Sequence, residues 1–225
     1  MTDILIEGGR ALIDGVFPDT SLSIADGRIR ETGASDRRGT IEIDARDLPV
    51  LPGIVDIHGD AFERQMMPRP KVDFPIDIAL IDSDRQAIAN GLTTVFHAAT
   101  SSWEPGLRSG DNAKKLLEAI ETLRPRLAAD TRFHLRHETY NLDAEEQIGE
   151  WLAGGRIDLF AFNDHMDGTV ALLDKPHKRA RMVERTGLSD QVFDDLVQRM
   201  VARADGVPAS PPRALASRRS QPNDR

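Results

Sequence analysis

The sequence predicts an α/β protein in which a parallel sheet with helical crossovers follows a small antiparallel β unit. Three observations predict this class. The first fifty residues are short apolar runs separated by turn residues, whereas strand and helix patterns alternate from Leu51 onward. After Val207 the apolar pattern ends, and Pro, Arg and Ser predominate. Alternation of strands and helices is typical of parallel strands joined by crossover helices.

The first fifty residues predict a series of short strands. Residues 7–10, Glu-Gly-Gly-Arg, form a connection typical of a hairpin between two of them. A second tight turn is expected at Asp26 and Gly27, because Asp-Gly favours hairpin turns. The strands themselves are expected at residues 4–6, 11–13, 22–24, 28–29 and 40–43.

The rest of the chain predicts four strand–helix units. Gly91 is placed to end the first helix, Pro125 to kink or end the second, and Ser189 with Asp190 to cap the last. Strands are expected at residues 53–58, 92–98, 132–138 and 157–163. Helices with an apolar stripe are expected at residues 77–90, 112–129 and 144–152 and from residue 189.

Four units make about half of a complete (β/α)8 barrel, which needs eight strands and typically about 250 residues. We therefore expect an incomplete barrel over residues 51–206, preceded by the β unit of residues 1–50. Residues 207–225 have no apolar period and are expected to be disordered. Their Pro, Arg, Ser and Ala content suggests the hypothesis of an out-of-frame reading of a GC-rich gene.

Composition narrows the classes of function. The formal net charge of −8 argues against a nucleic-acid-binding protein with a basic face. The chain has no cysteine, so a metal ion would need His, Asp, Glu or modified Lys ligands. No apolar run approaches the roughly 20 residues that span a bilayer, and no secretory signal pattern is present, so the sequence predicts a cytoplasmic protein. Phosphate-loop, serine-hydrolase and dinucleotide-binding motifs are absent.

The strongest chemical signal is the run Asp56-Ile57-His58-Gly59-Asp60. Residues two apart in a strand share a face, so Asp56, His58 and Asp60 are expected to project together. Ionisable groups are costly to bury unless they bind something, and the carboxyl ends of barrel strands carry active sites. An imidazole and carboxylates there suit Zn, Mn or Fe, whereas the alternative is a polar strand end with satisfied hydrogen bonds.

Two further strands end in similar residues. His134, Arg136 and Glu138 share one face of their strand, which makes Glu138 a candidate ligand and Arg136 a partner for Glu138 or for a substrate phosphate. His165 follows the next strand and is another candidate ligand. The alternative for the Arg136–Glu138 pair is a structural ion pair inside the barrel.

Basic residues also occur in the loop after the first barrel strand. Arg69 and Lys71 lie between prolines that stiffen this loop, and they could hold an anionic ligand over the site. Basic loop residues are more often simply solvated. His97 and His177 are interpreted as packing or surface residues.

The residues 51–60, Leu-Pro-Gly-Ile-Val-Asp-Ile-His-Gly-Asp, resemble the first-strand signature of the amidohydrolase superfamily, with Asp60 at the position of the usual second His. Together with the Pro-Arg-Pro-Lys-Val-Asp-Phe-Pro loop at residues 68–75, they are similar to the diphosphatases of the carbon–phosphorus lyase pathway. The similarity continues through residues 91–95, 134–138 and 164–165 and spans about residues 1–206.

This resemblance implies a metal-dependent hydrolase that releases diphosphate from α-D-ribose 1-methylphosphonate 5-triphosphate in phosphonate catabolism. It implies one or two divalent ions, Zn, Mn or Fe, and a phosphorylated small-molecule substrate. Residues 1–50 would be the N-terminal part of a composite β domain. Assembly of several copies into a homo-oligomer is a further possibility. The implied metal ligands are His58, Asp60, Glu138 and His165, and the implied substrate-binding residues are Arg69, Lys71 and Arg136.

The chain departs from the family pattern after Val207. The family continues into a strand ending in Ser-His-Asp-Asp and, later, a strand-end Asp that is the usual candidate for the general base. These motifs are not found here, so the catalytic base is unassigned and we expect a truncated chain without activity of its own. The alternatives are a non-catalytic remnant or metal-binding module, and another amidohydrolase such as a cyclic amidase or deaminase.

Overall fold

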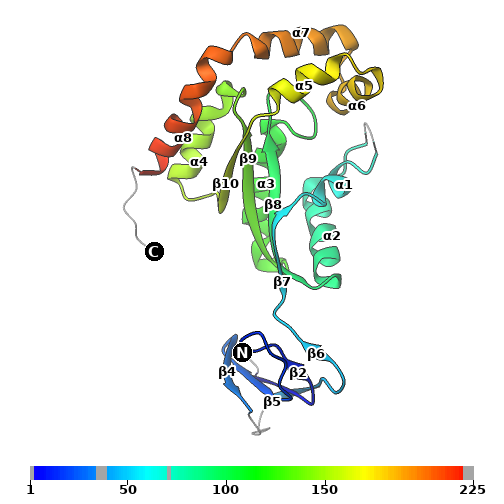
Figure 1. Ribbon diagram of the computed structural model, residues 1–225, viewed down its shortest axis with the longest axis vertical. Helices are drawn as coiled ribbons and strands as arrows, with labels where there is room; N and C mark the ends of the chain where they lie inside the picture. The colour runs from blue at the N-terminus through cyan, green and yellow to red at the C-terminus, as the bar shows by residue number, and fades with distance from the viewer. Residues whose placement is uncertain (1–2, 34–39, 70–71, 220–225) are drawn as a thin grey trace. The chain divides into compact units, whose positions relative to one another are not determined.

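A computed structural model describes residues 3–33, 40–69 and 72–219 of the chain (Figure 1). Its internal contacts divide the chain into two compact units, Met1–Gly53 and Ile54–Arg225, close to the boundary expected after residue 50. Each unit has its own β-structure. No helix within the described ranges is long and apolar enough to cross a membrane.

The smaller unit is built on a four-stranded sheet with strand order β4-β3-β1-β5. Asp26 and Gly27 form the predicted turn between β3 and β4, both with positive φ as a tight hairpin turn requires. The sheet is mixed, and the expectation of a purely antiparallel unit is wrong, because β1 pairs antiparallel with β3 but parallel with β5. The strands are β1 (Asp3–Glu7), β2 (Arg10–Ala11), β3 (Leu22–Ala25), β4 (Arg28–Thr32), β5 (Thr40–Asp44) and β6 (Pro49–Val50).

The hairpin expected across residues 7–10 does not form. Strand β1 is central in its sheet and both of its edges are already paired, so β2 pairs with β6 in a separate two-stranded ladder. Gly9 permits this path, because a Cβ atom there would lie 2.9 Å from both the Ala45 and Val50 side chains. Leu5 of β1 is completely buried and anchors the core of this unit.

The larger unit contains a parallel four-stranded sheet with strand order β10-β9-β8-β7. Its strands are β7 (Ile54–Gly59), β8 (Leu92–Ser101), β9 (Asp130–Glu138) and β10 (Leu159–Asn163). The helices α2 (Ile76–Ala89), α3 (Gly110–Leu123) and α4 (Glu145–Ala153) connect them (Figure 1). The predicted α/β class, with about four units of an incomplete barrel and a preceding small β unit, is therefore confirmed. The sheet is open at β7 and β10, each of which has one strand neighbour within the described part of the chain.

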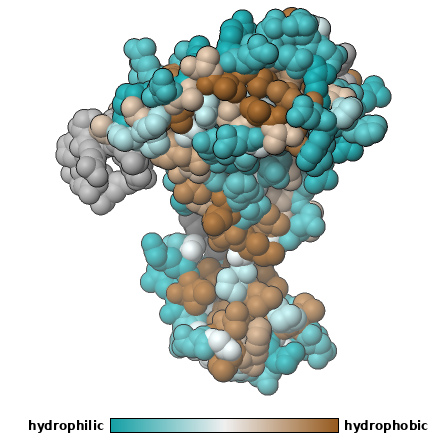
Figure 2. Space-filling view, turned by 45° about the horizontal axis from the view of Figure 1, so that its top comes forward, coloured by the Kyte–Doolittle hydropathy of each residue, from teal (hydrophilic) through white to brown (hydrophobic). Residues whose placement is uncertain are grey.

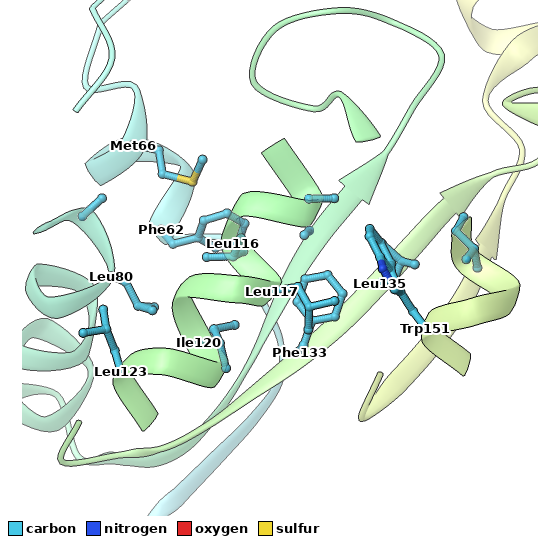
Figure 3. Packing of buried hydrophobic residues seen from close by; sticks show 14 of the residues in the cluster. Phe62, Met66, Leu80, Leu116, Leu117, Ile120, Leu123, Phe133, Leu135 and Trp151 are labelled. Carbon is cyan, nitrogen blue, oxygen red and sulfur yellow. The ribbon is translucent and has the colours of Figure 1, made fainter. Parts of the chain in front are cut away.

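One hydrophobic core lies between this sheet and its helices (Figure 3). Residues three and four apart on α3 form the apolar stripe that the sequence predicts, and Phe133 and Leu135 of β9 face it. Helix α3 ends at Leu123, earlier than expected, because Pro125 lies in a 3₁₀ turn at Arg124–Arg126. The core includes Phe62, Leu80, Leu116, Leu117, Ile120, Leu123, Phe133, Leu135, Ile148 and Trp151.

Before the last segment of the chain, three helices of the described residues escaped prediction because their sequences are short or polar. They are α1 (Phe62–Met66), α5 (Met166–Leu173) and α6 (Pro176–Thr186). The predicted helix after Ser189 is α7 (Asp190–Val201), and the Ser189 side chain accepts a hydrogen bond from the Val192 amide as a cap. Phe193, Val197 and Met200 of α7 pack with Met166 in a second, smaller cluster. Hydrophobic patches remain on the surface of the larger unit among hydrophilic side chains (Figure 2).

The end of the chain differs from the disordered tail that was expected over residues 207–225. Residues Ala204–Ala209 form a 3₁₀ turn and Ser210–Arg219 form α8, which packs against α4. Polar contacts join α8 to α4. Arg213 makes two hydrogen bonds with Glu145, and Ser210 is fully buried. Residues 220–225 lie outside the described residues.

Candidate active site at the strand ends

The carboxyl ends of β9 and β10 bring Glu138 and His165 together. Glu138 is the last residue of β9 and pairs in register with Asn163, the last residue of β10, so the two strands end side by side. His165 follows two residues later, and its Nδ1 atom lies 2.7 Å from Glu138 Oε1. Glu138 is buried, whereas the His165 side chain is 69% exposed. The sequence predicted both residues at this end of the sheet.

Arg136 lies two residues before Glu138 on β9, so the two side chains share one face of the strand. Its Nη2 atom donates a 2.7 Å hydrogen bond to Thr100 Oγ1, and its Nη1 atom lies 3.2 Å from His58 Nε2. A guanidinium group can only donate, so His58 Nε2 accepts. The Nε atom of Arg136 is buried and has no partner among the described residues. We call His58, Thr100 and Arg136 the arginine cluster.

Charges of both signs surround the Arg136 guanidinium. Burial is the largest cause that lowers its pKa, and the neighbouring Arg108 lowers it further, whereas Glu63, Asp60 and Glu138 act in the opposite direction. Arg108 is itself bound by Glu63, with Nη2 and Oε2 2.9 Å apart. The strand ends therefore gather two guanidinium groups and several carboxylates in a partly buried space.

The expected common face of Asp56, His58 and Asp60 is not found. The register between β7 and β8 shifts between Asp56 and Gly59, which breaks the alternation of side chains along β7. Asp56 Oδ1 accepts a hydrogen bond from the His58 amide, and the Asp56 side chain lines a cavity that also contains His97, between the sheet and α1 and α2. His58 instead turns toward Arg136, and Asp60 is exposed just beyond the strand.

His134, which shares its face of β9 with Arg136 and Glu138, has a structural role. Its Nδ1 atom lies 3.1 Å from the Ile57 carbonyl oxygen, to which it donates, and its ring stands edge-on to that of His58 with centroids 5.3 Å apart. Burial lowers the pKa of His134, and the neighbouring His58 lowers it further. This contact ties β9 to β7 across the open face of the sheet.

A cavity of about 270 Å³ lies above the strand ends, and we call it the His165 cavity. Sequence reasoning missed several of its residues, which belong to the loop after β8 and to α6. Their position directly after a barrel strand was the available signal, because such loops form active sites. Arg185 donates a 2.8 Å hydrogen bond to the buried carboxylate of Glu104. The lining includes Thr100, Ser102, Trp103, Glu104, Arg108, Glu138, His165, Thr169, Met182 and Arg185.

Arg69, in the basic loop after β7, stays apart from this cavity. Arg69 is exposed and forms an isolated bridge with Val72, and it does not line the His165 cavity. Lys71 lies outside the described residues. The structure therefore brings together Glu138 and His165, and separately His58 and Arg136, of the predicted site residues.

A divalent metal ion does not fit this arrangement. Within residues 3–33, 40–69 and 72–219, no group of three or more His, Asp and Glu side chains gathers as a metal site requires. Glu138 and His165 engage each other, and His58 directs its Nε2 lone pair at a cation, the Arg136 guanidinium. The predicted ligand set of His58, Asp60, Glu138 and His165 thus stays a prediction.

Comparison with known proteins finds a curated relative that is similar over most of this chain. No protein-family model matches the chain. It is 26% identical over 223 residues to alpha-D-ribose 1-methylphosphonate 5-triphosphate diphosphatase of Escherichia coli (strain K12), an alignment that covers 98% of this chain and 56% of the relative. The chain thus spans little more than half the length of this relative.

Solved structures with a similar chain path include hydantoinases. A D-hydantoinase is 24% identical with a TM-score of 0.47, and the likeness covers 76% of this chain and 37% of that one. The L-hydantoinase (dihydropyrimidinase) from Arthrobacter aurescens is 17% identical with a TM-score of 0.46, covering 71% of this chain and 32% of that one. The resemblance that the strand-end motifs indicate is confirmed: over nearly all its length this chain is similar to part of a ribose methylphosphonate triphosphate diphosphatase.

Proposed function

We propose that this chain is part of a hydrolase of the amidohydrolase superfamily that cleaves the triphosphate of α-D-ribose 1-methylphosphonate 5-triphosphate and releases diphosphate. Similarity over 98% of the chain to a diphosphatase of that name supports the substrate. The observation that carries the proposal is the partly buried Arg136 guanidinium at the carboxyl end of the sheet, beside Arg108 and the His165 cavity. Active sites of parallel barrels lie at this end.

The two guanidinium groups are suited to a polyphosphate. Arg108 lowers the pKa of Arg136, because the two positive charges repel each other. A phosphate between them would relieve this repulsion and accept bidentate hydrogen bonds from either group. The unpartnered Nε atom of Arg136 offers one more donor. Arg69 and Lys71 are proposed to bind the outer phosphates from their loop.

The proposal includes a divalent ion, Zn, Mn or Fe, as cofactor, with His58, Asp60, Glu138 and His165 as its ligands. Support for this part comes from the sequence resemblance and from the preference of these ions for imidazole and carboxylate ligands. To bind an ion together, His58 would have to leave Arg136, and Glu138 and His165 would have to open their mutual contact. A cytoplasmic location, a phosphorylated small-molecule partner and the absence of nucleic-acid or membrane partners are parts of the same proposal.

Diphosphate release tests the proposal directly. The full chain, supplied with Mn²⁺ or Zn²⁺, is incubated with the ribose methylphosphonate triphosphate, and diphosphate is measured against time. If the chain turns the triphosphate over, in contrast to the expectation from its sequence, Arg136→Met should raise KM by at least about tenfold, because it removes a charge-assisted phosphate contact. Arg132→Met serves as the matched control, since Arg132 lies on the same strand and pairs with Asp130 at its far end.

Other outcomes would favour the alternatives. Turnover of a hydantoin or dihydropyrimidine without turnover of the triphosphate would replace the diphosphatase with a cyclic amide hydrolase. A cooperative thermal melt without turnover of either substrate would favour a non-catalytic module. Such an outcome is compatible with a chain that spans 56% of the length of its relative.

A further inference from the structure

A second cavity, of about 190 Å³, lies on the helix side of the parallel sheet, and we call it the His97 cavity. His97 of β8 pairs in register with Phe133, which packs in the core against the helices. Thr100, three residues later, pairs with Arg136 and belongs to the opposite face of the sheet, where the arginine cluster lies. The polar residues that line the His97 cavity are Asp56, Gln65, Ser83, Gln86, Asn90 and His97.

Three buried polar atoms of this lining have no hydrogen-bond partner within the described part of the chain. They are Gln65 Oε1, Ser83 Oγ and His97 Nδ1. Ser83 is 7% exposed and His97 is 4% exposed. Buried polar atoms nearly always have a partner, and one left without a partner costs free energy. The three atoms come from α1, α2 and β8, so the missing partner belongs to the cavity that they share.

The unpartnered atoms call for a ligand that donates hydrogen bonds. Gln65 Oε1 can only accept, and the amide nitrogen of the same side chain already donates a 3.0 Å hydrogen bond to Gln86 Oε1. Burial is the main cause that lowers the pKa of His97 to about 4, so the ring is neutral at pH 7 and can present a lone pair at Nδ1. The Ser83 hydroxyl can accept as well as donate.

The charge of the lining favours a cation. Asp56 contributes a carboxylate, whereas no Lys or Arg of the described residues lines the cavity. The negative charge of Asp56 opposes the lowering of the His97 pKa, so this charge acts at the His97 ring. A Cβ atom at Gly59 would lie 2.9 Å from Asp56 Oδ2 and would crowd the carboxylate, so glycine leaves space there. An anion such as phosphate is unsuited to this cavity.

We propose that the His97 cavity binds a small primary amine in its protonated form. An ammonium group carries three hydrogen-bond donors, which match in number the acceptors offered by Gln65, Asp56 and His97. The cavity volume of about 190 Å³ far exceeds the roughly 10–15 Å³ that one water molecule needs, so an alkylamine has room. The apolar lining that would contact a short alkyl chain includes Phe62, Leu92 and Val95. This site goes beyond the proposed triphosphate hydrolysis and lies on the other face of the sheet.

Titration of the full chain with n-propylammonium chloride at pH 7.5 tests the proposal. Isotope-labelled histidine rings are followed by NMR, and His97→Leu identifies the His97 signals among those of the six histidines. The His97 signals are expected to shift with a Kd in the millimolar range, as so small a ligand allows, while those of exposed His177 stay unchanged. Tetramethylammonium has the charge but no N–H donor, and propionate has the opposite charge. Each should bind at least about tenfold more weakly.

Two variants locate the bound amine. Asp56→Asn should weaken propylammonium binding at least about tenfold, because the attracting charge is lost. Ser83→Ala should weaken it at least about threefold, because one hydrogen-bonding group is lost. Asp77→Asn, at an exposed position on the helix that carries Ser83, removes the same charge outside the cavity and should bind as wild type does.

Ser83→Ala carries the test if Asp56→Asn fails to fold, since the Ser83 hydroxyl has no partner to lose among the described residues. Unchanged His97 signals on addition of propylammonium would overturn the proposal and assign the cavity to ordered water. Equal binding of tetramethylammonium or propionate would also overturn it, as would wild-type affinity in either cavity variant that folds.

Discussion

The Nδ1 atom of His165 lies 2.7 Å from Glu138 Oε1, and this contact joins the ends of β9 and β10 above the sheet. The two residues differ in environment, since the Glu138 side chain is 10% exposed and that of His165 is 69% exposed. Both residues line the His165 cavity. It brings together two residues that lie in different predicted motifs.

A double-mutant cycle should measure the strength of this contact. Glu138→Gln, His165→Ala and the double variant are unfolded with urea at pH 7, and the coupling free energy is expected to be about 0.5 kcal/mol and below 1 kcal/mol, because solvent screens the exposed partner. Glu146→Gln, at an exposed position of α4, controls for the change in net charge. A coupling free energy above about 2 kcal/mol would contradict a solvent-screened contact.

His97 should make the larger unit less stable in mild acid. Burial is the main cause that lowers its pKa from 6.5 to about 4, against the opposing effects of Asp56 and Asp84. The folded state therefore favours the neutral ring, and its stabilising effect is complete above pH 6.5 and is lost as pH falls toward 4. Between pH 7 and pH 5 this residue alone should lower the free energy of unfolding by about 2 kcal/mol.

A comparison of variants isolates this contribution. His97→Leu should show a loss between pH 7 and pH 5 that is smaller than that of wild type by about 2 kcal/mol, as measured by urea unfolding at each pH. The pH dependence of the free energy of unfolding that remains in His97→Leu is attributable in part to His134 and His137. Burial also lowers the pKa values of these two residues. His177→Ala, at an exposed position, should retain the wild-type dependence. Identical pH profiles for His97→Leu and wild type would disprove the assignment.

The Arg185–Glu104 pair should matter to stability more than the exposed ion pairs do. The Glu104 side chain is 6% exposed and accepts a 2.8 Å hydrogen bond from Arg185 Nη2. Arg185→Met leaves this carboxylate buried without its partner and should cost about 2 to 3 kcal/mol of unfolding free energy. Arg132→Met, whose pair with Asp130 is nearly half exposed on both sides, should cost less than about 1 kcal/mol.

Adding Glu104→Gln to Arg185→Met should recover part of the loss, since a neutral amide costs less to bury than an unpaired carboxylate. Urea unfolding at pH 7 measures all four proteins. Equal losses for Arg185→Met and Arg132→Met would show that Glu104 keeps its hydration in solution.

Docking of helix α8 on α4 should depend on Arg213. Its guanidinium makes two hydrogen bonds with Glu145, at 2.6 and 2.8 Å, and these bonds join the two helices. Arg213→Ala should therefore speed amide hydrogen exchange in α8 by about fivefold, which corresponds to about 1 kcal/mol of local stability. Exchange in α3 should stay unchanged, and Arg199→Ala at an exposed position of α7 is the control. Unaltered exchange in α8 would mean that other contacts dominate its docking.

Local patterns account for the parts of the fold that the sequence predicted. The apolar stripe of α3 and the alternation of Phe133 and Leu135 with His134 and Arg136 each follow from the period of a single element. The Ser189 cap and the Asp26-Gly27 turn follow from residue chemistry within a few positions. These features need no information from distant parts of the chain.

The sequence also determined which residues end the barrel strands, and so placed Glu138, His165 and Arg136 at one edge of the sheet. It did not determine their partners. The irregularity in β7 separates Asp56 from His58, because the register with β8 shifts there. The hairpin at residues 7–10 fails for a similar reason, since both edges of β1 are taken by strands from elsewhere.

Only the tertiary structure decided which cation His58 meets, which loop residues line the His165 cavity, and that residues Ser210–Arg219 form a helix against α4. Each of these outcomes depends on groups that lie far apart in the sequence, such as Arg136 with His58 and Arg213 with Glu145. Periodicity reports which face of an element is buried, whereas the strength of a charge or hydrogen bond depends on distance and burial in three dimensions. The pairing of side chains therefore becomes known only once the strands are in register.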